Sequence, residues 1–186
     1  MGATFSIARM NIFFLSRRTR QCAKWHCDKH VVKMILESAQ LLYTAHHETG
    51  SQKLGNAPVC VSTGKRGYGS THKNHPCAIW VRQSLAHYYW LVWLAKDLIE
   101  EHKFRFSPAK PHGCLEHVLW LESNAPPILN RLWRDPPMAM PDECKMPDVV
   151  EAYRKYYNGP KRDRGLLKYT KRHMPHILKM DSFSPR

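Results

Sequence analysis

The feature that most constrains the fold is the stretch at residues 26–43, HCDKHVVKMILESAQLLY, because its polar and apolar residues alternate with the period of an α-helix. Side chains three or four positions apart share one face of such a helix. One face of the predicted helix is apolar: Val31, Ile35, Ala39 and Leu42. The opposite face carries two imidazoles, an amine, a carboxylate and a hydroxyl: His26, His30, Lys33, Glu37 and Thr44.

Four side chains on the polar face form the candidate catalytic group: His26, His30, Lys33 and Glu37. Imidazoles and a carboxylate one helical turn apart can exchange protons with a substrate, and burial and mutual proximity in a pocket would shift their pKa values towards those useful at neutral pH. Glu37 can act as a general base or stabilise a cation. Lys33 or Lys29 can attack a carbonyl carbon if its amine is desolvated. The alternative is an exposed polar stripe with an ordinary Lys33–Glu37 pair.

The remaining pattern predicts a mainly α-helical, single-domain bundle with a long basic loop and an irregular proline-rich segment. Helical periodicity and capping residues predict helices at residues 21–47, 75–103, 113–123, 148–158 and 160–172. The basic loop falls at residues 50–75 and the proline-rich segment at residues 125–147.

The domain is predicted to span residues 10–175. Residues 1–9 are an expected extension, and residues 176–186 an expected disordered tail. The apolar run at residues 11–15 is either a short strand or a buried extended segment.

The net charge of +14, from 29 Lys and Arg against 15 Asp and Glu, implies a polyanionic partner, and DNA is the first candidate. Residues 152–172 interleave basic residues with tyrosines, whose rings can stack on exposed bases. The alternative for that segment is a solvated helix with its tyrosines in the core. The predicted DNA contacts are Lys29, Lys65, Arg66, Lys73, His75, Arg82, Arg154, Lys155, Tyr156, Tyr157, Lys161 and Arg162.

No run of residues is apolar for long enough to predict a membrane-spanning helix, so we expect no membrane association. The first nine residues lack the basic start and apolar centre of a signal peptide, and the six cysteines lack disulfide-framework spacing. We therefore expect an intracellular protein, in the host cytoplasm or nucleus if it is viral. We also expect a monomer that needs no cofactor.

A zinc-dependent nucleic-acid enzyme is the second interpretation. His26 and His30 are four residues apart on the predicted helix and can bind one ion. The ligands available to complete a tetrahedral site are Cys27, His72, His75 and Cys77. The HxxxH spacing lacks the Glu of HExxH, and the chain has no CxxC motif.

Two blocks of the chain resemble small proteins of bacteriophages and large DNA viruses. The first joins MNIFFL to HCDKHVVKMILESAQLL, and the second joins THKNHPCAIWVRQS to YYWLVWLAKDLIEEHKFRF. These blocks cover the early helix and the predicted central helix.

More remotely, the order of features resembles the pyrimidine dimer DNA glycosylases of the endonuclease V type, which are small, basic and mostly helical. Those proteins carry a histidine seven residues before a catalytic glutamate and an aromatic-basic YKYY-like stretch near the end. His30 and Glu37 have this spacing, Asn74-His75-Pro76 resembles a histidine-containing segment of the family, and YRKYY at residues 153–157 resembles the final stretch. The arginines that flank the family's glutamate are missing here.

The resemblance implies an enzyme that removes a damaged pyrimidine and then nicks the abasic strand through an imine. Glu37 would stabilise the charged intermediate and assist proton transfer, while basic residues grip a bent duplex with an extruded base. The family uses the amine of its own N-terminus, whereas nine residues precede Met10 here. The amine would come from a chain that starts at Met10, or from Lys33 or Lys29; otherwise the lyase step is absent.

The third interpretation is a non-catalytic DNA-binding or packaging protein. The surplus of positive charge and the aromatic-basic segment would suffice for that role. Glu37 would then be dispensable, which separates this interpretation from the glycosylase.

Overall fold

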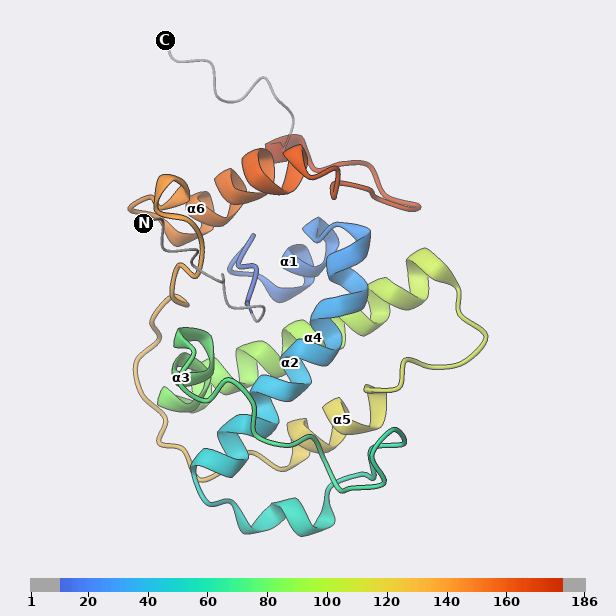
Figure 1. Ribbon diagram of the computed structural model, residues 1–186, viewed down its shortest axis with the longest axis vertical. Coiled ribbons are helices and arrows are strands. Elements are labelled where there is room, and N and C mark those ends of the chain that lie inside the picture. The colour runs from blue at the N-terminus through green and yellow to red at the C-terminus, as the bar shows by residue number, and fades with distance from the viewer. Residues whose placement is uncertain (1–10, 179–186) are drawn as a thin grey trace, which may run out of the picture.

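The computed structural model describes residues 11–178, and within that range six α-helices surround one hydrophobic core (Figure 1). They are α1 (Thr19–Trp25), α2 (Asp28–Glu48), α3 (Pro76–Gln83), α4 (Leu85–Phe106), α5 (Leu115–Ser123) and α6 (Val149–Tyr156). The β-pairing among these residues is one isolated bridge between Val59 and Arg66. The predicted mainly α-helical class is confirmed. None of the described helices is long and apolar enough to span a membrane.

The two long helices, α2 and α4, pack against each other at the centre of the molecule (Figure 1). Helices α3 and α5 each contact both of them, and α1 packs against α4. The predicted apolar face of α2 is confirmed, because its four side chains are fully buried: Val31, Ile35, Ala39 and Leu42. Burial of each large aliphatic side chain contributes about 1.5–3 kcal/mol, which fixes the orientation of α2 and leaves its other face for polar groups.

The predicted helix at residues 21–47 is in fact two helices, because the chain leaves helical geometry at His26 and Cys27. Both residues have extended backbone angles. The backbone N–H of Asp28 donates to Lys168 O at 2.8 Å instead of continuing the ladder of α1. A segment near the far end of the described chain therefore fixes where α2 begins.

The predicted helix at residues 75–103 is likewise divided, at Ser84. Its backbone is extended, and its Oγ accepts from the N–H of Ala86 at 3.2 Å and donates to Arg131 O at 2.9 Å. Ser84 is thus the N-cap of α4 and links that helix to the proline-rich segment.

Residues 11–15 form a buried extended segment rather than a strand. Four of their side chains are at most 5% exposed: Ile12, Phe13, Phe14 and Leu15. Phe13 O accepts a hydrogen bond from Cys22 Sγ of α1 at 3.1 Å. The ring of Phe13 lies between His30 of α2 and Tyr157, the residue that follows α6.

After α6 the chain forms a π-helical turn, η3 (Tyr157–Lys161), and helical geometry stops at Asp163. The predicted helix at residues 160–172 is therefore wrong over most of its length. Gly165 takes a left-handed φ of 65°, which ends the helix, and the chain beyond it runs extended. Figure 1 shows α6 and this segment, coloured orange to red, as a layer over α1.

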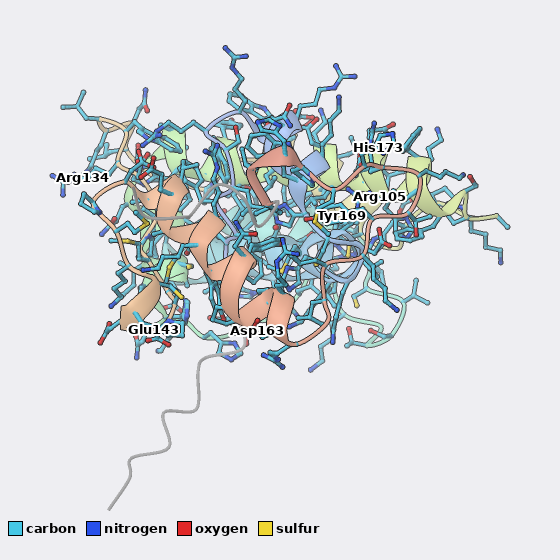
Figure 2. The ribbon with its side chains drawn as sticks, turned by 90° about the horizontal axis from the view of Figure 1, so that it is seen from above. Arg105, Arg134, Glu143, Asp163, Tyr169 and His173 are labelled. Atoms are coloured by element: carbon cyan, nitrogen blue, oxygen red, sulfur yellow. The ribbon has the colours of Figure 1, made fainter. Side chains whose placement is uncertain are left out.

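An ion network fixes that C-terminal layer to the helices below it. Arg105 of α4 has a fully buried guanidinium that donates to Glu101 Oε1 at 2.8 Å and to Asp28 Oδ1 at 2.9 Å. Arg172 donates to both oxygens of Glu101, at 2.8 and 2.9 Å. Burial acts to raise the pKa of Glu101, but the hydrogen bonds from Arg172 and Arg105 hold it below its ordinary value. Tyr169 lies beside Arg105, with its ring centre 5.5 Å from the guanidinium carbon (Figure 2).

The first three residues of the predicted tail are structured. They form a 3-10 turn, η4 (His176–Leu178), and Leu178 is fully buried. The rest of the predicted tail and the predicted extension at residues 1–9 lie outside the described residues.

The two predicted irregular segments differ in how much local structure they contain. The loop at residues 50–75 includes a 3-10 helix, η1 (Gln52–Asn56), and the bridge between Val59 and Arg66. The proline-rich segment is irregular, as predicted, apart from η2 (Asp142–Cys144).

Gly67, in the loop at residues 50–75, packs against the buried ring of Tyr43 of α2, and the φ of Gly67 is 65°. A Cβ at this position would lie 2.5 Å from Tyr43 Cε1. We expect Gly67→Ala to lower the free energy of unfolding by about 2–4 kcal/mol, from left-handed strain plus overpacking. Gly64→Ala is the matched control, because Gly64 has a φ of 66° but open space around it, so only the backbone strain of about 1 kcal/mol should appear. If urea unfolding gives the same loss of free energy for both variants, the contact with Tyr43 does not contribute to the effect of Gly67→Ala.

Candidate functional site

A cavity of about 330 Å³, here called the Glu37 cavity, lies between α2, the extended segment and the turn after α6. Its lining residues are Asn11, Phe13, Lys29, His30, Lys33, Glu37, Tyr156, Lys161, Arg164 and Leu166. Six of them are sequence-predicted site residues: Lys29, His30, Lys33, Glu37, Tyr156 and Lys161. The cavity joins one carboxylate to the side-chain cations of three lysines and one arginine, which suits an anionic ligand.

Lys29, Lys33 and Glu37 reach the cavity together because intervals of four residues keep them on one face of α2. Lys33 Nζ lies 2.8 Å from Glu37 Oε1. The backbone N–H of Asn11 donates to Glu37 Oε2 at 3.4 Å. Glu37 is only 7% exposed, so its carboxylate is held from two sides in a nearly buried position. The ion pair itself adds little stability, because the Lys33 side chain is half exposed.

Asn11 is fixed in its turn by its own side chain. Its Nδ2 donates to Ala139 O at 2.8 Å, and its Oδ1 accepts from the hydroxyl of Tyr153 at 3.0 Å. Asn11 is not among the sequence-predicted site residues, because an extended segment carries no helical period that would place it beside Glu37. Three other lining residues were not predicted either: Phe13, Arg164 and Leu166.

His30 is buried between two aromatic rings. Its imidazole stacks on Phe13, with ring centres 4.1 Å apart, and its Nδ1 hydrogen-bonds with the hydroxyl of Tyr157. Burial, together with nearby His26 and Lys161, lowers the pKa of His30 to about 2. At neutral pH His30 is therefore uncharged and can offer the cavity a hydrogen bond but not an acidic proton.

The structure does not place His26 in the Glu37 cavity. The break between α1 and α2 puts this residue in the core, so its predicted position on a face shared with Glu37 is wrong. His26 Nδ1 donates to Cys22 O at 2.7 Å, and Nε2 has no hydrogen-bond partner among residues 11–178. Burial lowers the pKa of His26 to about 4.

The two buried histidines make stability depend on pH. A histidine in the unfolded chain binds a proton near pH 6.5, whereas folded His26 and His30 stay neutral to lower pH. The unfolded state then binds more protons, so the free energy of unfolding falls as pH drops below 6.5. For His26 alone we expect a loss of about 3 kcal/mol by pH 4. Urea unfolding at a series of pH values measures this loss of stability. NMR ring signals of His26 that titrate near pH 6.5 would contradict the lowered pKa of His26.

The aromatic residues of the C-terminal region have different roles from those predicted. Tyr156 lines the cavity, but Tyr157 is fully buried and hydrogen-bonds with His30. The prediction that Tyr157 contacts DNA is therefore wrong, because a core ring cannot stack on a base. Lys161 lies inside the cavity wall, 8% exposed, and not on an open surface.

The other predicted contacts of this region do not line the cavity. Arg154 Nε donates to Leu15 O at 3.2 Å, and Arg162 donates to the backbone oxygen of Leu178. Both guanidiniums thus bind the protein's own backbone. Lys155 is exposed on α6 and has a surface position in which it can contact a phosphate.

The predicted DNA contacts in the loop at residues 50–75 and in α3 form a separate group, none of which lines the Glu37 cavity: Lys65, Arg66, Lys73, His75 and Arg82. Lys65 and Arg66 are exposed, and Lys73 and His75 line a shallow pocket. Arg82 donates to Lys73 O at 2.7 Å and lines a cavity of about 770 Å³ with Arg131 and Arg134.

The predicted zinc ligands are not gathered at one point. Among residues 11–178, no group of three or more His, Cys, Asp and Glu side chains is arranged to hold a metal ion. Cys27 is buried at the N-cap of α2, and Cys77 Sγ donates to Asn11 Oδ1 at 3.9 Å. Zinc stays a prediction, which elemental analysis of the purified protein tests.

Comparison with protein families, with curated proteins and with solved structures gives no match to this chain. The structure defines a helical protein in which one nearly buried carboxylate shares a cavity with four cations.

Proposed function

We propose that the protein is a DNA repair enzyme, an N-glycosylase with abasic lyase activity on damaged pyrimidines. The observation that carries the proposal is the carboxylate of Glu37, held between Lys33 Nζ and the N–H of Asn11 inside a cationic cavity. The net charge of +14 and the resemblance to pyrimidine dimer glycosylases support the same activity.

The cavity suits one extruded nucleotide more than a whole duplex. Its volume of about 330 Å³ lies at the lower end of small-ligand pockets. Lys29 and Arg164 are exposed at its wall and can bind the phosphates on either side of the extruded sugar. Enzymes that act on a base must take it out of the stack, and a damaged base costs less to extrude.

Glu37 then faces the sugar carbon at which positive charge develops. Its carboxylate stabilises the oxocarbenium or imine cation and accepts a proton during strand cleavage. The imine requires an amine close to that carboxylate, and the side chains of Lys29, Lys33 and Lys161 line the same cavity as Glu37. Lys33 Nζ lies 2.8 Å from Glu37 Oε1, and a chain that starts at Met10 carries its amine one residue before the N–H of Asn11.

The test is incision of ultraviolet-irradiated and undamaged duplex DNA by the purified protein in the presence of a chelator. We expect release of the damaged base and breaks in the irradiated DNA only. Activity that appears only after zinc is added would favour the metal-dependent enzyme. Equal binding of both DNAs without base release would favour the non-catalytic DNA-binding protein.

A further inference from the structure

Lys161 is a buried lysine whose position results from an unusual turn. It is the last residue of the π-helical turn η3 (Tyr157–Lys161), which contains Pro160. Proline has no N–H for the helical ladder, and the wider π turn accommodates it. Single π turns occur often at functional sites, and this one puts Lys161 in the wall of the Glu37 cavity.

The ammonium group of Lys161 has aromatic neighbours rather than a carboxylate partner. Nζ lies 4.7 Å from the ring centre of Tyr156 and 5.1 Å from that of Phe13. Among residues 11–178, no Asp or Glu oxygen pairs with it within ion-pair distance. Such cation–π contacts replace only part of the stabilisation that water gives to an exposed ammonium group.

The other lysines of the cavity have different surroundings. Lys33 is half exposed and paired with Glu37, and Lys29 is exposed, so water or a carboxylate stabilises their charged forms. Burial, and then the charge of Arg164, lower the pKa of Lys161. A lysine becomes a nucleophile when its amine loses the proton, and desolvation beside another cation favours that loss.

The geometry points to Lys161 as the amine that forms an imine with the C1′ aldehyde of an abasic deoxyribose bound in the Glu37 cavity. This inference rests on the proposed function and names the group that performs its covalent step. The lone pair of Nζ forms the bond to C1′. The carbonyl oxygen then leaves as water with the two amine protons, and a carbon–nitrogen double bond remains. Lys33 serves to orient Glu37.

The first test uses the full chain and a duplex with one aldehydic abasic site, in the presence of sodium borohydride. Borohydride gives a hydride to the imine and makes the bond permanent, and mass spectrometry of the digested protein locates it. We expect the adduct on Lys161. An adduct on Lys33, on Lys29 or on the amino terminus would overturn this inference and leave the proposed function standing. No adduct at all would count against both.

The second test compares variants by the same trapping reaction. Lys161→Arg keeps the charge and removes the nucleophile, and Lys161→Met removes both, so we expect loss of the adduct in each. Lys110→Arg, at an exposed lysine between α4 and α5, is the control that should keep it. A melting curve shows whether each variant folds.

A third measurement avoids DNA and variants altogether. Wild-type protein is treated with 2-deoxyribose 5-phosphate and borohydride, and the labelled lysines are identified. Labelling of Lys161 ahead of the exposed lysines supports the inference, whereas labelling in order of exposure contradicts it.

Discussion

Replacing Glu37 by glutamine will reduce base removal and strand cleavage by about 10²–10⁴-fold, the range for loss of a group that moves a proton in the transition state. Glutamine has nearly the same shape and can still accept a hydrogen bond from Lys33, which lies 2.8 Å from the Glu37 carboxylate. It lacks the negative charge that stabilises a cation at C1′. The affinity for duplex DNA should stay the same or rise, because the cavity loses its one anionic side chain.

Single-turnover rates and binding curves at one fixed salt concentration measure the two effects separately. Glu100→Gln is the matched control, since Glu100 is an exposed carboxylate on α4 that does not line the cavity. Full activity in the Glu37 variant would reject a catalytic role for this residue.

Replacing Arg105 by methionine will lower the free energy of unfolding by about 3–5 kcal/mol, the usual result of removing one partner from a buried ion network. The Arg105 side chain is fully buried and bonds with three partners at 2.8–2.9 Å: Glu101, Asp28 and Lys24 O. Methionine fills much of the space but leaves the buried Glu101 carboxylate with Arg172 as its remaining cation.

Arg20→Met is the control for this prediction, because Arg20 is exposed on α1 and should change stability by less than about 0.5 kcal/mol. Urea unfolding of both variants at neutral pH gives the comparison. A loss below about 1 kcal/mol for Arg105→Met would show that hydrophobic packing replaces the network. The network also holds residues 168–172 over α2, so we expect hydrogen exchange in that segment to increase in the variant.

The sequence predicts the helices well and their boundaries less well, for a physical reason. Periodicity reports which residues are apolar, and the buried face of α2 follows from it directly. The break at His26 and Cys27 depends on a hydrogen bond from Asp28 to Lys168, which no local pattern contains. The break at Ser84 had a local signal, since serine is a favoured N-cap residue.

In the candidate site, too, local spacing predicts some features, and contacts between distant segments determine the others. The interval of four residues predicts that Lys33 and Glu37 share a face, and both line the cavity. The contribution of Asn11 and the burial of Lys161 depend on contacts between distant segments, so sequence spacing does not reveal them. Charge and residue type alone cannot distinguish a lysine on the surface from one inside a cavity wall.

Borohydride trapping shows directly whether the protein forms an imine with damaged DNA. Metal-free protein, starting at Met1 or at Met10, is incubated with irradiated or undamaged duplex under borohydride. We expect a covalent adduct with the irradiated DNA only, and from both chains if Lys161 supplies the amine. Salt-sensitive binding of both DNAs with no adduct to either would contradict this expectation.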